Sequence, residues 1–219
     1  MDCIGKDVWS TVRDGGITIA LKKNKVKFGL TNVYYARITG WSVDGTPVYE
    51  IPVRLPGAVN LSIDANGEAD NFYADNSVYY VINNNAGYSG DLEIALVPTE
   101  FATNILGEVL DGNGVLAERN DSELTEFALA FEFSGDKNKI RHWMYRCSAS
   151  RPKTESSTTE ENTEVKTETL SIKAAALPNG FVKSKTCEST EESVYLNWFK
   201  NVYYPSVKAK SAAATTTKE

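Results

Sequence analysis

The segment GYSGDLEIALVPTEFATNILG, residues 87–107, decides the fold of this chain. Apolar and polar residues alternate in its first half, with Leu92, Ile94 and Leu96 set against Asp91, Glu93 and Ala95. This period of two is typical of a β-strand that buries one face in a core. Pro98 has no N–H group to donate, so we expect the strand to end before it.

A short helix is expected directly after Pro98. The Thr99 hydroxyl can cap its first turn by accepting a free backbone N–H. The apolar face of this helix would consist of Phe101, Ile105 and Leu106. Gly107 tolerates the left-handed dihedral angles with which many helices end. The whole segment holds no nucleophile, base or metal-ligand set, and it therefore indicates architecture rather than chemistry.

Further strand patterns dominate the rest of the chain. Runs of alternating, β-branched or aromatic residues occur at 26–38, 48–65, 79–82, 126–133, 139–150 and 164–174. A glycine in the first run hints at a bulge. Asn66 and Gly67 are typical of a hairpin turn, because both residues accept positive φ.

Two of these runs have well-defined faces. In the first we expect Phe127, Leu129, Phe131 and Phe133 to point inward. The outward set is Glu126, Ala128, Ala130 and Glu132. In the run that follows, Trp143, Tyr145 and Cys147 should share one face.

A second short helix is expected from Thr190. Two pairs of apolar residues, Val194 with Trp198 and Tyr195 with Phe199, are four positions apart. Strands and helices do not alternate along the chain, which argues against a parallel Rossmann-like sheet. We therefore expect a mainly β fold, an antiparallel β-sandwich or partly closed barrel with one flanking α-helix.

Composition sets limits on the class of protein. The chain of 219 residues fits one domain, or one domain with appended arms, and its formal net charge is −6. That balance argues against a surface that coats nucleic acid, which would need basic patches. No apolar run reaches the roughly 20 residues of a membrane helix. Asp2, Lys6 and Asp7 interrupt the apolar core that a signal peptide would need, so synthesis in a cytoplasm is expected.

The sequence offers little for catalysis or metal binding. Cys3, Cys147 and Cys187 lie far apart and His142 is the sole histidine, so four clustered zinc ligands are missing. Residues 111–120 resemble a calcium loop, but Ser122 occupies the twelfth position, where an EF-hand has glutamate. We expect a surface loop there, a packed or surface His142, no cofactor, no metal and no enzymatic activity.

Several strands share one arrangement, an apolar face opposite a face of small and acidic residues. The second set comprises Ser62, Asp64, Asp91, Glu93, Ala128 and Glu132. Ordinary half-exposed sheets have this pattern. It would equally suit the wall of a channel through which a polyanion slides without sticking.

The chain resembles the phi13-type major tail proteins of long-tailed bacteriophages. The segments that carry the resemblance are KFGLTNVYYA (27–36), LPGAVNLSID (55–64), FYADNSVYYV (72–81), NNNAGYSGDLEIALVP (83–98), LGEVLDGNGVL (106–116), FALAFEFSGDKNKIRHWMYRCSASRP (127–152) and YLNWFKNVYYP (195–205). They occur in the same order as in the family. The resemblance divides the chain into an N-terminal arm (1–25), a tail tube β-sandwich domain (26–205) and a flexible C-terminal tail (206–219).

The resemblance implies a structural virion protein of the tail tube type. Such proteins form hexameric rings whose inner sheets join, and the stacked rings become the conduit for viral DNA during ejection. Its partners would be further copies of itself and the tape measure, tail terminator and distal tail proteins, with transient, non-specific passage of DNA and no membrane. The small acidic face would line the lumen. Residues at inter-subunit or inter-ring contacts would include Asn66, Gly67, Lys153, Glu155, Glu160 and Trp198.

Two other classes of function stay open. A carbohydrate-binding β-sandwich module would show exposed aromatic rings, and Trp41, Tyr34 and Tyr35 are the only tempting set. A secreted hydrolase is disfavoured, because the sequence has neither a signal peptide nor a GxSxG motif.

Overall fold

The computed structural model describes residues 10–13, 16–19, 29–67, 69–74, 77–83, 85–133, 139–153 and 166–205. Several sequence predictions lie outside this part of the chain. They are the C-terminal tail 206–219, much of the N-terminal arm, and the contact residues Glu155 and Glu160.

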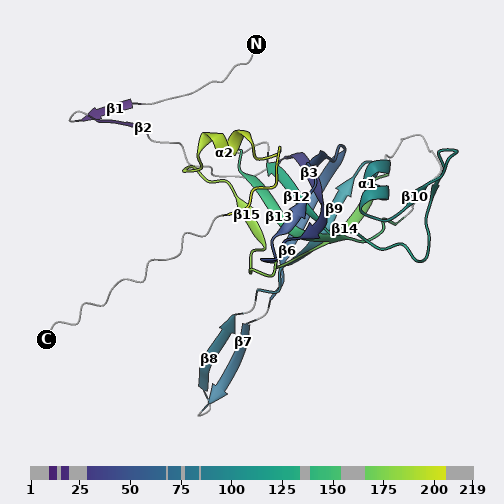
Figure 1. Ribbon diagram of the computed structural model, residues 1–219. Helices are drawn as coiled ribbons and strands as arrows, with labels where there is room; N and C mark the ends of the chain where they lie inside the picture. The colour runs from purple at the N-terminus through teal and green to yellow at the C-terminus, as the bar shows by residue number, and fades with distance from the viewer. Residues whose placement is uncertain are drawn as a thin grey trace, which may run out of the picture.

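Nine strands form one antiparallel sheet, which is the body of the molecule (Figure 1). Its main order is β4-β3-β12-β13-β14-β9-β6, while β5 pairs with β3 and β15 pairs with β13. The bounds are β3 (Leu30–Trp41), β4 (Pro47–Tyr49), β5 (Val53–Arg54), β6 (Ala58–Ala65), β9 (Tyr88–Ile94), β12 (Phe127–Phe133), β13 (Arg141–Ala149), β14 (Glu168–Ala175) and β15 (Lys183–Lys185).

The remaining elements are small. Three two-stranded hairpins are β1 (Ser10–Arg13) with β2 (Gly16–Ile19), β7 (Ala69–Ala74) with β8 (Ser77–Asn83), and β10 (Val109–Leu110) with β11 (Leu116–Ala117). The helices are α1 (Thr99–Asn104) and α2 (Glu192–Leu196). The predicted mainly β, antiparallel fold is confirmed, and the described strands do not close into a barrel.

The first core lies between the sheet and α1. Phe101 is fully buried and its ring meets Tyr35 edge-on at 5.0 Å and Phe127 at 5.6 Å. Ile105 and Leu106 are buried beside it, so the predicted apolar face of the helix is confirmed. Such edge-to-face contacts add about 1 kcal/mol each to the burial of the rings. The helix therefore covers one side of the sheet.

Details of this corner differ from prediction. Pro98, not Thr99, is the residue before the helix, and its carbonyl accepts the N–H groups of Phe101 and Ala102. No side chain caps the helix. The strand ends at Ile94, so Leu96 is 70% exposed rather than aligned with the core. Gly107 has φ +73° at the end of this turn, as expected.

The pair Asn66-Gly67 does not form the predicted tight turn. The Asn66 N–H donates to the Gly87 carbonyl, and the Ala86 N–H donates to the Asn66 carbonyl. The β6–β9 ladder thus continues to Asn66, and the chain then extends into the β7–β8 hairpin. That hairpin projects well beyond the body (Figure 1). Residues Ala69–Ala74, which follow this point, are therefore strand.

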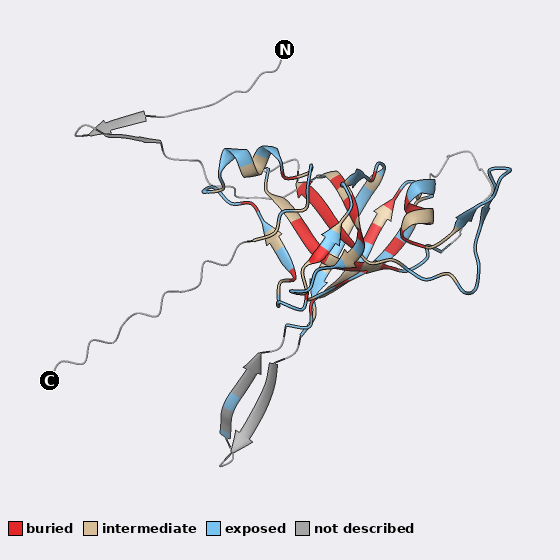
Figure 2. Cartoon of the chain, in the orientation of Figure 1, coloured by how far each residue is buried: buried red, intermediate tan, exposed pale blue. Residues whose placement is uncertain are grey.

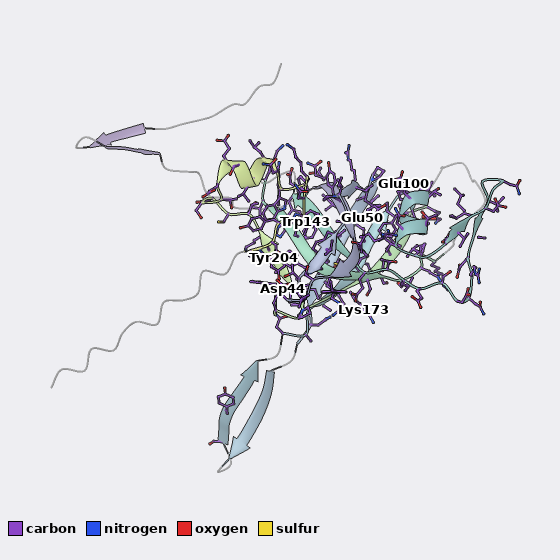
Figure 3. All side chains as sticks on the ribbon, viewed as in Figure 1. Asp44, Glu50, Glu100, Trp143, Lys173 and Tyr204 are labelled. Carbon is purple, nitrogen blue, oxygen red and sulfur yellow. The ribbon has the colours of Figure 1, made fainter. Side chains whose placement is uncertain are left out.

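A second core covers the opposite face of β3, β12 and β13. Trp198, Phe199 and Tyr204 from the segment 192–205 pack there against Ala36, Ala128 and Ala130. We call this segment the strap. Figure 2 shows the buried strands in red beneath the exposed turns of α2, and Figure 3 places Trp143 and Tyr204 on the same side. α2 begins at Glu192, because the Thr190 hydroxyl accepts the Cys187 N–H instead of capping the helix.

A register shift in β13 divides its predicted face. Phe127 pairs with Cys147, whereas Leu129 pairs with Met144, so one extra residue lies between these two pairs on β13. Cys147 and Met144 consequently join the first core, while Trp143 and Tyr145 join the second. Burial raises the pKa of the Cys147 thiol to about 12, so the thiol stays protonated at neutral pH.

Candidate functional site

The candidate site is the exposed face of β6, β9 and β14. The register aligns three rows across these strands, Asn60–Glu93–Thr169, Ser62–Asp91–Ser171 and Asp64–Ser89–Lys173. We call these nine residues the polar face. They contain three carboxylates and one ammonium, a net charge of −2.

The polar face exists because the strands alternate. Leu92, Leu170 and Ile172 point the opposite way and are buried in the first core. Gly90 lets β6 approach β9 closely, since a Cβ there would lie 1.9 Å from the Ser62 carbonyl oxygen. Any larger residue would push the two strands apart, so the flatness of this face depends on that glycine.

Short hydrogen bonds hold two of the carboxylates in place. The Ser171 hydroxyl donates to Asp91 Oδ1 at 2.7 Å, and the Thr167 hydroxyl donates to Glu93 Oε1 at 2.5 Å. The carboxylates therefore accept from neighbouring side chains and keep their charge toward solvent. The face presents fixed negative charge among hydroxyl and amide groups, with the single ammonium of Lys173 at its edge (Figure 3).

Four of the six residues predicted for this face lie together on it. Ser62, Asp64 and Asp91 are exposed and Glu93 is half-buried. Whether they line a lumen stays a prediction.

Ala128 and Glu132 were predicted to lie on the same exposed face as these four residues, and this prediction is wrong. Ala128 is completely buried and Glu132 is 1% exposed. The reason is the strap, which covers the side of β12 that faces away from the first core. Alternation distinguished the two sides of this strand correctly, but both sides are core.

Glu132 is held in an ion pair beneath the strap. Its Oε2 is 2.8 Å from Arg141 Nε, and its Oε1 accepts from Asn32 Nδ2 at 3.3 Å. The Arg141 guanidinium lies 3.8 Å from the centre of the Tyr195 ring and 4.8 Å from that of Phe199. The pair thus links the sheet to two aromatic residues of the strap.

One side of β13 binds the backbone of the strap. Arg141 donates to the carbonyl of Tyr195, Trp143 Nε1 donates to that of Trp198 at 3.0 Å, and the Tyr145 hydroxyl donates to that of Tyr203 at 3.0 Å. Three side-chain donors at alternate positions of β13 therefore bind three backbone carbonyls of the strap. Sequence reasoning missed this contact, although the alanines of β12 and the aromatic-rich strap were its visible signals.

The contact residues predicted between copies fall in different places. Asn66 and Gly67 lie at the base of the projecting hairpin, and Lys153 is exposed. Trp198 is only 2% exposed and packs in the second core, so the surface position predicted for it is wrong. Contacts between copies stay a prediction for the other five residues, of which Glu155 and Glu160 lie outside the described part of the chain.

The described residues contain no group of three or more His, Cys, Asp or Glu side chains that could hold a metal ion. His142 is packed, stacking on Phe131 with ring centres 4.8 Å apart. The carboxylate of Asp111 accepts the N–H groups of Val115 and Asn113, which lowers its pKa and closes a surface turn. None of the described helices is long and apolar enough to cross a membrane.

The aromatic residues considered for carbohydrate do not form a platform. Tyr35 is buried in the first core, while Tyr34 stacks on Phe199 of the strap at 4.8 Å. Only Trp41 is substantially exposed, and the Arg146 guanidinium lies over its ring.

No protein-family model matches the chain, and no curated protein matches it. A chain in the cryo-EM structure of the anti-feeding prophage (AFP) baseplate is similar over 78% of this chain and all of that one, with TM-score 0.43 and 9% identity.

Proposed function

We propose that this chain is a structural protein of a phage-like virion that assembles as stacked hexameric rings and forms a tail tube. Viral DNA would pass through the tube during ejection. The chain would act without catalysis, in contact with further copies of itself and with other tail proteins, after synthesis in a bacterial cytoplasm. Two observations support this function, the resemblance in sequence and the geometry of the sheet.

The observation that carries the proposal is the polar face together with the open edge of β6. β6 is the last strand of the sheet and pairs only with β9 among the described strands. An unpaired edge of this length is a template for another strand. A neighbouring copy that paired there would continue the sheet, and the polar face would continue with it. Repetition around a ring would close the edges, as a barrel does.

The chemistry of the polar face suits the passage of DNA. A duplex carries one phosphate charge per about 1.7 Å of its axis, and proteins that bind it tightly neutralise phosphates with Lys and Arg. Asp64, Asp91 and Glu93 would repel that charge, and Lys173 is the single cation among the nine residues. A wall of this kind confines a polyanion without holding it.

Electron microscopy of the purified full-length protein across a concentration series tests this proposal. Rings or hollow tubes are expected, with Ser62, Asp64, Asp91 and Glu93 facing the axis in a reconstruction. Tubes whose axis is lined by other residues would refute the role of the polar face. A protein that stays monomeric at every concentration, alone and with tail initiation proteins, would refute tube formation itself.

A further inference from the structure

The β10–β11 hairpin is an exposed apolar protrusion. Val109, Leu110, Val115 and Leu116 are between 37% and 58% exposed. Leu110 and Leu116 are direct partners across the hairpin, so their side chains lie on the same side of it. Grouped apolar side chains on a protruding loop mark an interaction surface rather than ordinary scattered exposure. We call residues 109–117 the knob.

The knob is preformed. The Asp111 N–H donates to the Val115 carbonyl at 2.9 Å, and the Asp111 carboxylate accepts two backbone N–H groups of the same turn. Two ion pairs, Arg119–Asp121 and Arg151–Glu118, fix the chain that follows. Little conformational freedom would be lost when such a loop docks, which favours binding.

A pocket that suits the knob lies elsewhere in the chain. It has a volume of about 240 Å³ and its walls include Leu61, Ile63, Tyr88, Phe131, Met144 and Lys183. A cavity of about 150 Å³ with such a lining already holds benzene, so this pocket has room for one or two aliphatic side chains. Its lining residues come from β6, β9, β12, β13 and β15, and several of them belong to the first core.

The segment that contains the knob and the wall of the pocket carry charges of opposite sign. Residues 107–124 carry five carboxylates and one guanidinium, a net charge of −4. The pocket has Lys183 in its wall, with its ammonium 4.1 Å from the centre of the Tyr88 ring, and exposed Lys185 follows on β15. Neither lysine is in an ion pair with another described residue. The knob belongs to an acidic segment, and the pocket has Lys183 in its wall with Lys185 nearby on the same strand, so the two surfaces are complementary in charge.

The two surfaces of one chain cannot meet. β10 and β15 lie on opposite flanks of the body (Figure 1). We propose that the knob of one copy docks into the pocket of the next copy. This contact is head-to-tail, and its repetition generates a closed ring or an open filament. The inference rests on the proposed self-assembly and names the surfaces through which neighbours would recognise each other.

The first test breaks the knob. The double variant Leu110→Lys with Leu116→Lys would bring two ammonium groups into a pocket that already has Lys183 in its wall, and we expect the concentration needed for assembly to rise about a hundredfold. Leu96→Lys is the matched control, because Leu96 is exposed and apolar but outside the knob. Its assembly should equal that of the wild type. Equal melting temperatures of both variants would show that folding is intact, and unchanged assembly of the knob variant would overturn the proposal.

The second test identifies the partner directly. Leu110→Cys and Lys183→Cys are introduced into separate chains that also carry Cys3→Ser and Cys187→Ser, and the mixture is oxidised. Mass spectrometry should find a disulfide between positions 110 and 183. Disulfides only between like positions would overturn head-to-tail docking, as would no disulfide at all. If wild-type tubes form nevertheless, the tube function stands and only the knob contact fails.

Discussion

Two regions on the same side of one sheet, the side away from the first core, carry similar sequence patterns and end in opposite environments. On β6, β9 and β14 the residues that point away from the first core are exposed and form the polar face. On β12 and β13 the corresponding residues are buried under the strap. The difference shows that alternation identifies the apolar side of a strand but leaves the environment of the other side undetermined.

The side chains of the two regions explain why the strap covers β12 and β13 and not the polar face. The strap needs room, and Ala36, Ala128 and Ala130 provide it, because a methyl group lets large rings approach the sheet. The polar face has hydroxyls and carboxylates at these positions, whose burial without partners would cost several kcal/mol. Glu132 is buried only because Arg141 and Asn32 satisfy it.

The largest expected effect is at the centre of the strap. Trp198→Ala removes a buried indole from the second core, and we expect the free energy of unfolding to fall by about 4 kcal/mol. Urea denaturation followed by circular dichroism measures it. Trp41→Ala is the control, since Trp41 is 43% exposed and its loss should cost less than about 1 kcal/mol. Equal losses at both positions would mean that the strap does not cover the sheet.

The second largest effect on stability is expected at the buried ion pair between Glu132 and Arg141. Glu132→Ala leaves the Arg141 guanidinium without its carboxylate, and we expect a loss of about 3 kcal/mol in the same assay. The matched control is Glu50→Ala, which breaks the exposed Arg37–Glu50 pair and should cost about 0.5 kcal/mol. A loss at Glu132 no greater than that at Glu50 would contradict the buried position of the pair.

Local patterns predicted most of the fold. The alternation in residues 87–97 and 126–133 identified both strands and the first core, and the apolar spacing after Pro98 identified α1. These features depend on neighbours in sequence, so a single chain reveals them. Four residues of the candidate site followed from the same alternation.

The missed features depend on contacts between distant segments. The strap meets β12 from about 70 residues away in sequence, so the alanines of β12 and the aromatic residues of the strap reveal the contact only when the two segments are considered together. The bulge that turns Cys147 into the first core has no residue signature of its own. The Asn66-Gly67 pair has the local sequence of a turn. Hydrogen bonds between Asn66 and residues Ala86 and Gly87 instead extend the pairing of β6 with β9 as far as Asn66.

Introducing a leucine in each of the two regions sharpens the comparison. Ala128→Leu overfills the second core, and we expect a loss of about 2 kcal/mol. Ser62→Leu adds a similar volume on the polar face, where the side chain extends into solvent, and should change stability by less than about 0.5 kcal/mol. Thermal unfolding of the two variants measures the contrast. If Ala128→Leu is tolerated as well as Ser62→Leu, the strap does not press on the sheet.

The smallest expected effect is the removal of charge from the polar face. The triple variant Asp64→Asn, Asp91→Asn and Glu93→Gln keeps shape and most hydrogen-bonding capacity, because an amide oxygen still accepts from the hydroxyls of Ser171 and Thr167. Three like charges on adjacent strands repel weakly in water, so unfolding free energy should change by less than about 1 kcal/mol and in the stabilising direction. A loss above about 2 kcal/mol would mean that these carboxylates serve the fold. A neutral result leaves their negative charge free for a role outside the chain, which in the proposed tube is to keep DNA from adhering to the wall.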